Sequence, residues 1–296
     1  MPWFIFALLA PAFFGITNFI EKYILDKHIK DPTTVMTLSC FINGLLGLFL
    51  LFTFKEFRII TYDRAFFLII SGALMVIYAL PYYKALLLED ASTVIPLFQF
   101  ISVFTFLLGA IFLKEFLTIK QLLGLIVIVI AGLFLGSDRI GKMLKPRKAF
   151  WLMLLSCFLI SLVLVILKDS SNIYGFWKSM TYNLLGGGLF GLILFCVPKV
   201  RKSIKKVNLK KIGALLVLDD CVDMTGRLCY FYAQTLTLVA LAELVRSTQA
   251  FFVLIYGIFL TLLFPRVIKE DIKWITIRNK ILVGVIMFLG MWLVYF

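Results

Sequence analysis

Charged residues are scarce in this 296-residue sequence, at 16%, whereas 62% of its residues are hydrophobic and 31 are phenylalanine. A water-soluble domain of this length cannot bury that much apolar surface, because too large a share of any compact chain faces water. The scarcity of charge therefore excludes an ordinary soluble domain and indicates a protein that lies in lipid. No short, charged, cleavable leader precedes the first apolar run, so we expect a membrane span at the N-terminus and not a signal peptide.

The residues and motifs of several common chemistries are also missing. A single histidine, His28, and the absence of a CxxC pair exclude the usual zinc arrangements. The five cysteines lie inside apolar runs, which argues against a disulfide framework. Neither a phosphate-binding loop nor a dinucleotide fingerprint is present, so we expect no cofactor and no ATP-driven step.

Basic residues outnumber acidic ones by 30 to 16, yet their distribution argues against nucleic acid as a partner. Most of them lie in short gaps between apolar runs, where Lys and Arg orient a membrane protein and contact lipid headgroups. The gaps after the first, third, fifth, seventh and ninth runs are the more basic set. The positive-inside rule then places these gaps in the cytoplasm and both termini outside it.

Apolar runs of about 20 residues, the length needed to cross a bilayer, recur along the whole chain. They cover residues 3–25, 33–54, 64–88, 91–113, 119–136, 148–168, 174–197, 209–237, 240–264 and 278–296. No strand-like alternation competes with them. The sequence therefore predicts an all-α, polytopic membrane protein of ten transmembrane helices. Two gaps are almost absent, after the third and the eighth run, which predicts two tight antiparallel hairpins.

The chain is also internally repeated. Residues 82–113 and 231–262 share one plan, with an aromatic pair, a near-absent loop and a span that starts with polar residues. A basic gap and a glycine-bearing last run follow in both. Five spans per half is an odd number, so homologous halves must insert with opposite orientation. We therefore predict a 5+5 inverted repeat, with halves at 1–138 and 149–296, a basic linker at 139–148, and a solute site between the halves.

Three short motifs follow one another in the fourth and fifth runs of the first half. Ala91-Ser92-Thr93-Val94-Ile95-Pro96 opens the fourth run, Lys114-Glu115 closes it, and Gly124 precedes Ala131-Gly132 in the fifth. Together they resemble the EamA-type half of the drug/metabolite transporter (DMT) superfamily. The resemblance implies export or exchange of small metabolites such as amino acids, a cavity lined mainly by spans one, three, four, six, eight and nine, and both termini in the cytoplasm. That orientation is opposite to the one that the charge distribution favours.

The second half departs from the family pattern. Val245 stands where the proline is expected, and Phe264-Pro265 replaces the usual Gly-Glu. The acidic string at 219–223 is not part of the pattern either.

Polar side chains inside spans are costly and are therefore functional candidates. In the eighth run Asp220, Asp223, Arg227, Tyr230 and Gln234 recur at helical spacing, and we expect this stripe to line a water-filled cavity. The other candidates for solute contact are Asn18 and Lys22 in the first run, Tyr78 and Tyr82 in the third, Gln99 in the fourth, and Glu243 and Arg246 in the ninth. Glu21 and Gln249 are further polar residues of the first and ninth runs, and Glu115 at a span end is expected to be solvated.

The candidate residues allow two interpretations. Asp223–Arg227 and Glu243–Arg246 have the spacing of structural ion pairs within one helix. Alternatively, three carboxylates beside one arginine in the eighth run leave an excess of acid, so that one of them can take up and release a proton. Arg227 or Arg246 could hold a carboxylate or phosphate bidentately. This mixture favours a zwitterion or an organic cation as the solute, moved by alternating access with possible coupling to protons.

Two rival hypotheses remain open. Asp219-Asp220-Cys221-Val222-Asp223 is a DDxxD string that resembles the magnesium–diphosphate site of membrane prenyltransferases. Such enzymes need a second acidic motif, and the only other candidate, Asp26 to Asp31, has the wrong spacing. The third hypothesis is a lipid-linked-sugar flippase on the same fold. We favour the transporter, with a small solute and the bilayer as its partners, as monomer or homodimer, in a cell membrane such as the bacterial inner membrane.

Overall fold

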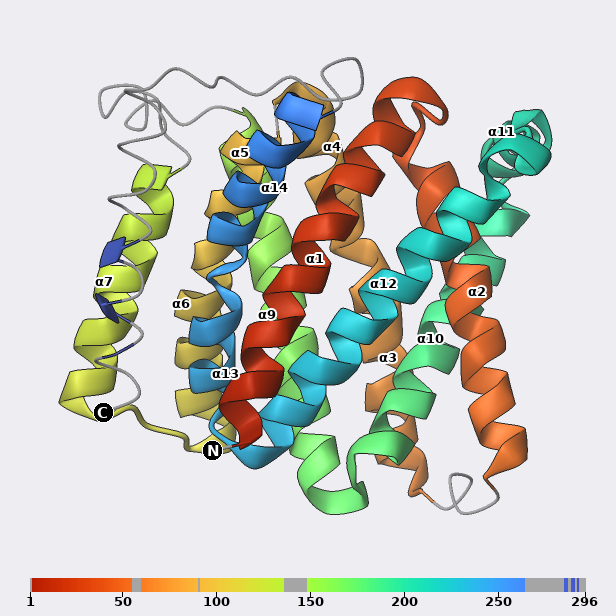
Figure 1. Cartoon of the computed structure of the whole chain (residues 1–296). Coiled ribbons are helices and arrows are strands. Elements are labelled where there is room, and N and C mark those ends of the chain that lie inside the picture. The colour runs from red at the N-terminus through yellow and green to blue at the C-terminus, as the bar shows by residue number, and fades with distance from the viewer. Residues whose placement is uncertain are drawn as a thin grey trace.

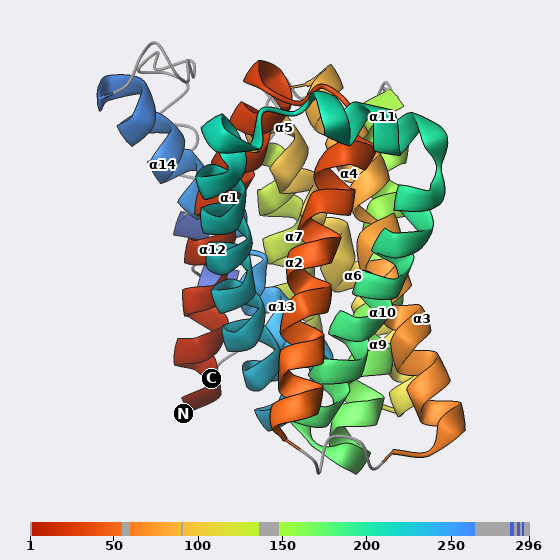
Figure 2. The same cartoon turned by 90° about the vertical axis from the view of Figure 1, so that its right-hand side faces the viewer.

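The computed structural model describes residues 2–54, 60–89, 91–135 and 148–263, together with 285, 286, 289, 290 and 292. Within these residues every regular element is helical, and the longer helices run side by side in one bundle (Figures 1 and 2). The first part of the chain forms α1 (Pro2–Lys27), α2 (Pro32–Thr53), α3 (Tyr62–Ile77), α4 (Ala79–Leu88), α5 (Ala91–Val94), the 3-10 helix η2 (Ile95–Phe98), α6 (Gln99–Leu108), the π-helix η3 (Gly109–Leu113) and α7 (Ile119–Leu135). The second part forms α9 (Lys148–Tyr174), α10 (Phe176–Cys196), α11 (Pro198–Lys206), α12 (Leu209–Leu236), α13 (Val239–Arg246) and α14 (Gln249–Leu263).

The first nine predicted runs coincide with these helices, while the third, fourth and ninth are each broken into shorter pieces. The tenth run and the predicted linker lie mostly outside the described residues. Both predicted hairpins are present, because α4 ends at Leu88 just before α5, and α12 ends at Leu236 just before α13. A short helix that the sequence did not predict, α11, occupies the basic gap after the seventh run.

Six helical stretches of the described chain are long and apolar enough to cross a membrane. They are Trp3–Lys27, Pro32–Thr53, Tyr62–Leu88, Lys148–Tyr174, Phe176–Cys196 and Val239–Thr261. The protein is therefore an all-α, polytopic membrane protein. Helix α12 is not among the six, and its 28 residues carry the acidic string and Arg227.

Local sequence explains where several helices begin and end. Pro32 occupies the first turn of α2, where its missing N–H costs nothing. Pro81 cannot donate to the carbonyl of Ile77, and α3 ends at that residue. The helix resumes as α4 after Tyr78, so the third run is bent at this tyrosine. Gly175, between α9 and α10, has a φ of 83°, a backbone conformation that suits glycine.

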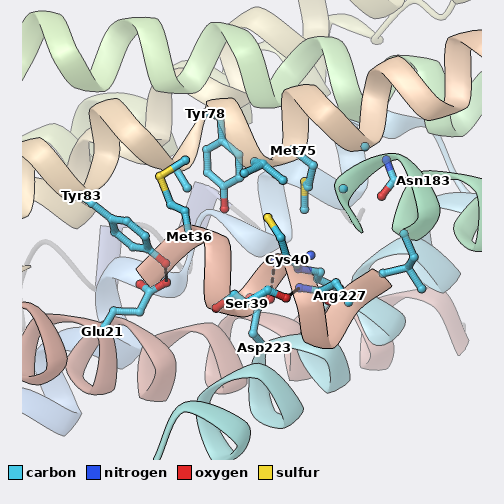
Figure 3. A pocket seen from close by; sticks show the side chains of 16 residues that line it. Glu21, Met36, Ser39, Cys40, Met75, Tyr78, Tyr83, Asn183, Asp223 and Arg227 are labelled. Atoms are coloured by element: carbon cyan, nitrogen blue, oxygen red, sulfur yellow. Dashed lines mark hydrogen bonds and ion pairs between the residues drawn. The ribbon is translucent and has the colours of Figure 1, made fainter. Parts of the chain in front are cut away.

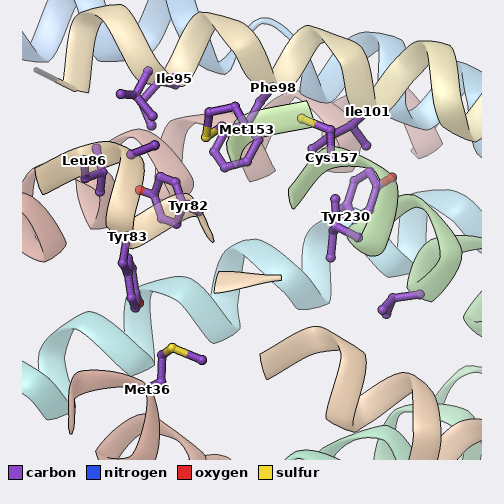
Figure 4. Packing of buried hydrophobic residues seen from close by; sticks show 14 of the residues in the cluster. Met36, Tyr82, Tyr83, Leu86, Ile95, Phe98, Ile101, Met153, Cys157 and Tyr230 are labelled. Carbon is purple, nitrogen blue, oxygen red and sulfur yellow. The ribbon is translucent and has the colours of Figure 1, made fainter. Parts of the chain in front are cut away.

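Helix α9 lies in the middle of the bundle and packs against α3, α4 and α6. Its buried side chains, among them Met153 and Cys157, join a core that also contains Tyr82, Phe98 and Ile101 (Figure 4). The rings of Tyr82 and Phe98 lie 5.1 Å apart between centroids. Large apolar side chains also cover outward faces, such as Phe49, Ile111 and Ile193, each more than 60% exposed. Lipid is the solvent in which such a surface is stable.

The sequence led us to expect a solvated Glu115, and this expectation was wrong. Glu115 is half-buried, and its carboxylate accepts a hydrogen bond from the backbone N–H of Val239 at 2.8 Å. Val239 is the first residue of α13, so the acid satisfies one of the free N–H groups of that helix and lies at the positive end of its dipole. A contact between the end of the fourth run and the start of the ninth thus joins the two parts of the chain.

Candidate functional site

A central cavity of two connected arms lies inside the helix bundle. Each arm has about 60 Å³ of space for water-sized molecules, and the two arms share five lining residues: Glu21, Met75, Tyr78, Asp223 and Arg227. The Ser39 arm is lined in addition by residues of α2, α3 and α10, including Ser39, Asn43 and Asn183 (Figure 3). The Arg246 arm is lined in addition by Phe14, Asn18, Tyr82, Phe98, Tyr230, Arg246 and Gln249, among others.

An ion pair stands where the two arms meet. Asp223 and Arg227 are four residues apart on α12, which brings their side chains together on one face of the helix. Arg227 Nη2 lies 2.5 Å from Asp223 Oδ2, and the two side chains are 16% and 24% exposed. Tyr78, at the break between α3 and α4, lines both arms beside this pair. The backbone break thus coincides with the centre of the cavity.

Glu21 of α1 lies opposite the pair and has no basic partner in the described structure. Its two carboxylate oxygens accept hydrogen bonds from the hydroxyl groups of Tyr82 and Tyr83, both at 2.7 Å. Tyr82 in turn accepts a hydrogen bond from the side-chain amide of Asn18 at 2.8 Å. The adjacent tyrosines of α4 therefore hold a carboxylate at the cavity wall without neutralising it.

Glu243 and Arg246 form a second ion pair at the far end of the Arg246 arm. Arg246 donates from Nε and Nη2 to the two carboxylate oxygens of Glu243, at 2.8 and 2.6 Å. Tyr230 of α12 donates to the same carboxylate at 2.6 Å, and Gln234 donates to the hydroxyl of Tyr230 at 3.0 Å. The guanidinium carbon of Arg246 lies 5.4 Å from the Tyr230 ring centre. Glu243 is fully buried, and both of its carboxylate oxygens accept hydrogen bonds, from Arg246 and from Tyr230.

One further amide completes a continuous chain of hydrogen bonds across the protein. Gln249, at the start of α14, accepts from Arg246 at 3.1 Å and donates to Asn18 at 2.6 Å. Through Asn18 and Tyr82 the chain continues to Glu21. Polar groups separated by more than 200 residues in the sequence are thus linked along the cavity.

The fourth and ninth runs are both interrupted at the cavity. In the fourth, η2 gives way to α6 at Gln99; in the ninth, Ser247 and Thr248 separate α13 from α14. Gln99 donates from Nε2 to the backbone carbonyl of Ser247 at 2.6 Å, so each interruption supports the other. Irregular backbone at membrane depth is tolerated where protein or a cavity satisfies it, and such interruptions are typical of solute sites in carriers.

The predicted solute-contact residues fall into two groups. Seven line the cavity: Asn18, Tyr78, Tyr82, Asp223, Arg227, Tyr230 and Arg246. The other five stand behind its wall: Lys22, Gln99, Asp220, Gln234 and Glu243. Of these, Gln99, Gln234 and Glu243 support lining residues or the helix break, whereas Lys22 donates to the carbonyl of Leu86.

Sequence reasoning did not include several residues that do line the cavity. Glu21 was noted only as a polar residue of the first run and Tyr83 only as part of the aromatic pair at 82–83; Ser39, Asn43 and Asn183 were not noted at all. Asn183 donates to Ser71 at 2.8 Å between α10 and α3. A polar side chain inside an apolar run was the available signal for most of them.

Fold and site together define an integral membrane protein built around an internal polar cavity. The chain belongs to the EamA-like transporter family, whose model matches residues 1–137. This family is one of transporters and not of enzymes. Its membership suggests secondary transport of a small solute as the general activity.

The chain is also similar to two further proteins. It is 32% identical over 132 residues to an uncharacterized protein of Methanocaldococcus jannaschii, MJ1333.1, and the match covers 45% of this chain and 94% of the relative. A protein of known crystal structure matches with a TM-score of 0.59 at 12% identity, over 97% of this chain and 95% of its own. At that identity the structural match supports the fold alone.

Proposed function

We propose that this protein is a secondary carrier of a small polar metabolite, a zwitterion such as an amino acid or an organic cation, across the cell membrane. The observation that carries the proposal is the central cavity, where ionised and hydrogen-bonding side chains from α1, α4, α12, α13 and α14 converge. Asp223 and Arg227 provide both signs of charge at its centre. Access alternates as one half of the molecule rocks against the other around this site.

The proposal includes two inverted five-helix halves, at 1–138 and 149–296. One support is a pair of equivalent lysines near the ends of α1 and α9. Lys22 of α1 donates to the carbonyl of Leu86 near the end of α4 at 2.6 Å. Lys168 of α9 donates to the carbonyls of Gln234 and Thr237 at the end of α12. In each half, a lysine from the first span thus binds the C-terminal end of the third, where a cation is favoured by the helix dipole.

Packing between the halves supports the same proposal. Helix α1 packs against α12, α13 and α14, while α9 packs against α3, α4 and α6. In each case the first span of one half packs against the third and fourth spans of the other half. Gly290 of the tenth run also lies against α7, since a Cβ there would come within 3.3 Å of the Gly124 carbonyl. The relative from Methanocaldococcus jannaschii, 94% of which aligns with 45% of this chain, supports a repeat unit of about half the chain.

Inverted halves make a direct prediction for labelling. Lys30 follows α1, and Ile173 lies near the end of α9; both side chains are exposed. In a background without the native cysteines, Lys30→Cys and Ile173→Cys should react with a membrane-impermeant thiol reagent from opposite sides of sealed vesicles. The positive-inside rule expects Lys30→Cys to be labelled from the cytoplasmic side. Labelling of both positions from one side would contradict the proposed topology.

Asp223→Asn tests the role of the central ion pair. The change keeps the shape of the side chain but leaves Arg227 without its partner and removes a charge from the cavity. We expect uptake into proteoliposomes to fall about tenfold or more, the scale of losing a charge-assisted hydrogen bond, and its dependence on pH to become flat. The control is Asp26→Asn, which removes a half-exposed partner of Lys22 outside the cavity. Unchanged uptake with an unchanged pH profile would remove Asp223 from the mechanism.

The solute itself can be sought by stabilisation. A ligand that binds only the folded state raises the melting temperature by mass action. We expect stabilisation by amino acids or amines and none by prenyl diphosphate with Mg²⁺. The opposite pattern would favour the prenyltransferase hypothesis.

A further inference from the structure

A dense cluster of positive charge lies on the segment that joins α10 to α12. All of its basic side chains are exposed, and together they form the basic patch: Lys199, Arg201, Lys202, Lys205, Lys206, Lys210 and Lys211. The sequence has no Asp or Glu between Asp169 and Asp219. Within the described part of the chain, no acid forms an ion pair with a residue of the patch. The proposed carrier function makes no use of this charge.

The basic patch lies at the boundary between hydrocarbon and water. Helix α10 has 21 residues, a length of roughly 30 Å that suffices to cross the hydrocarbon core. Only Val197 separates its end from α11. Figures 1 and 2 show α11 lying across one end of the bundle, between the ends of α10 and α12. Phe195, Val197 and Leu209, which flank α11 in the sequence, are exposed apolar residues. Basic side chains next to an exposed apolar surface are typical of the headgroup level of a membrane.

Helix α11 is amphipathic, and the protein covers its apolar stripe. Val200, Ile204 and Val207 follow one another at intervals of four and three residues, which places them on one helix face. Val200 is 5% exposed, α11 packs against α2, and Val207 contacts the main hydrophobic core. Because this stripe is used for packing within the protein, α11 is held in place with its basic side chains outward.

The basic patch is electrostatically costly without an external anion. Arg201 and Lys205 are like charges four residues apart on α11, an arrangement that destabilises a helix. Lys210 and Lys211 lie in the first turn of α12, where the helix dipole disfavours cations. By contrast, each Lys or Arg near an anionic membrane surface strengthens binding roughly fivefold, which outweighs the repulsion of one such pair. A negatively charged lipid surface would therefore offset the cost.

We propose that the basic patch binds the headgroups of anionic phospholipids. Their phosphate oxygens accept hydrogen bonds from lysine and arginine side chains, and the exposed apolar residues beside the patch contact the acyl chains. The partner is a lipid surface and not a nucleic acid, because the patch lies at the end of a transmembrane helix, where headgroups already surround it. The positive-inside rule assigns it to the cytoplasmic leaflet, in which anionic lipids are concentrated. Bound lipid thus holds the start of α12, the helix that carries Asp223 and Arg227.

The test compares the melting temperature of the full-length protein in two kinds of vesicle. One is phosphatidylcholine alone, and the other is equal parts of phosphatidylcholine and phosphatidylglycerol. A ligand of the folded state raises the melting temperature by mass action, so we expect the wild-type protein to melt about 2 °C or more higher in the anionic vesicles. This advantage should shrink at high salt, because salt screens exposed charges.

A triple variant, Arg201→Gln with Lys202→Gln and Lys205→Gln, removes three positive charges from the exposed face of α11. We expect it to lose most of the advantage in anionic vesicles. In phosphatidylcholine it should melt no lower than the wild type, since repulsion within the patch is relieved, and this result also shows that the variant is folded. Should it melt lower there, the salt dependence of the wild-type protein decides instead.

The matched control removes three scattered, exposed charges outside the patch, with Lys27→Gln, Lys30→Gln and Lys148→Gln. It should keep the advantage in anionic vesicles. The proposal is overturned if the wild-type protein melts at one temperature in both vesicles, if the advantage survives in the α11 variant, or if the control loses as much. Equal stabilisation in phosphatidylcholine by inorganic phosphate or a short DNA duplex would assign the patch to another anion. These results do not bear on the carrier function, because no transport is measured.

Discussion

Glu243→Ala is expected to destabilise the protein by about 3–5 kcal/mol, the cost of leaving one partner of a buried ion pair without the other. Glu243 is fully buried, and its removal leaves the guanidinium of Arg246 without an anionic partner, beside the neutral side chains of Gln249 and Tyr230. Tyr230 would lose the acceptor of its hydroxyl as well. The measurement is the apparent melting temperature in detergent, at one fixed scan rate.

Asp169→Ala is the matched control for this variant. It also removes the acid of an ion pair, Arg64–Asp169, but these side chains are 33% and 40% exposed. Screening by water and salt limits such a pair to roughly 1 kcal/mol or less. The double variant Glu243→Met with Arg246→Met should regain much of the lost stability, because no unpaired charge remains. Equal losses of stability for Glu243→Ala and Asp169→Ala would show that burial does not make the Glu243–Arg246 pair more important than an exposed pair.

Gly186→Ala should be severely disruptive, whereas Gly187→Ala, one residue further on, should be tolerated. A Cβ at Gly186 would lie 2.1 Å from the carbonyl oxygen of Ile69 and 2.7 Å from two more backbone atoms of that residue. Backbone cannot rotate away, so α10 and α3 would have to separate. A Cβ at Gly187 would meet nothing closer than 3.6 Å. Overpacking of this kind costs about 1–3 kcal/mol or more, while alanine gains up to about 1 kcal/mol over glycine in a helix.

The pair can be compared by thermal unfolding and by the fraction of monodisperse protein after extraction. Both variants add the same methyl group to adjacent positions of one helix, so effects of expression or hydrophobicity cancel. We expect the Gly186→Ala protein to melt lower or to aggregate, and the Gly187→Ala protein to match the wild type. Similar behaviour of the two would mean that α3 and α10 are not in close contact at this point.

Much of the fold could be predicted from the sequence because lipid imposes a simple rule. A helix must bring about 20 apolar residues to cross the bilayer, and each of the first nine runs is found as helix. The breaks were harder to predict. Pro81 marks the bend at Tyr78, but no proline stands at the interruption after Arg246, which depends on the contact from Gln99 to Ser247.

The candidate site likewise contains residues that could be predicted from the sequence and residues that could not. The stripe of α12 was visible in the sequence because helical periodicity is local, and in the structure Arg227 pairs with Asp223 and Gln234 donates to Tyr230, while Asp220 and Gln234 do not line the cavity. Glu21 was passed over, since its partners Tyr82 and Tyr83 come from another helix.

By itself, the sequence determined that this is an integral membrane protein, where its apolar helices lie along the chain, and which rare polar side chains occur within them. Those properties follow from local composition and from the cost of exposing polar backbone to hydrocarbon. Only the tertiary structure decided which of these side chains meet: that Asn18 joins Gln249, and that Asp219 and Asp220 are left without a basic partner in the described chain. Such pairings depend on how helices far apart in the sequence rotate and cross, and periodicity along one helix does not contain that information.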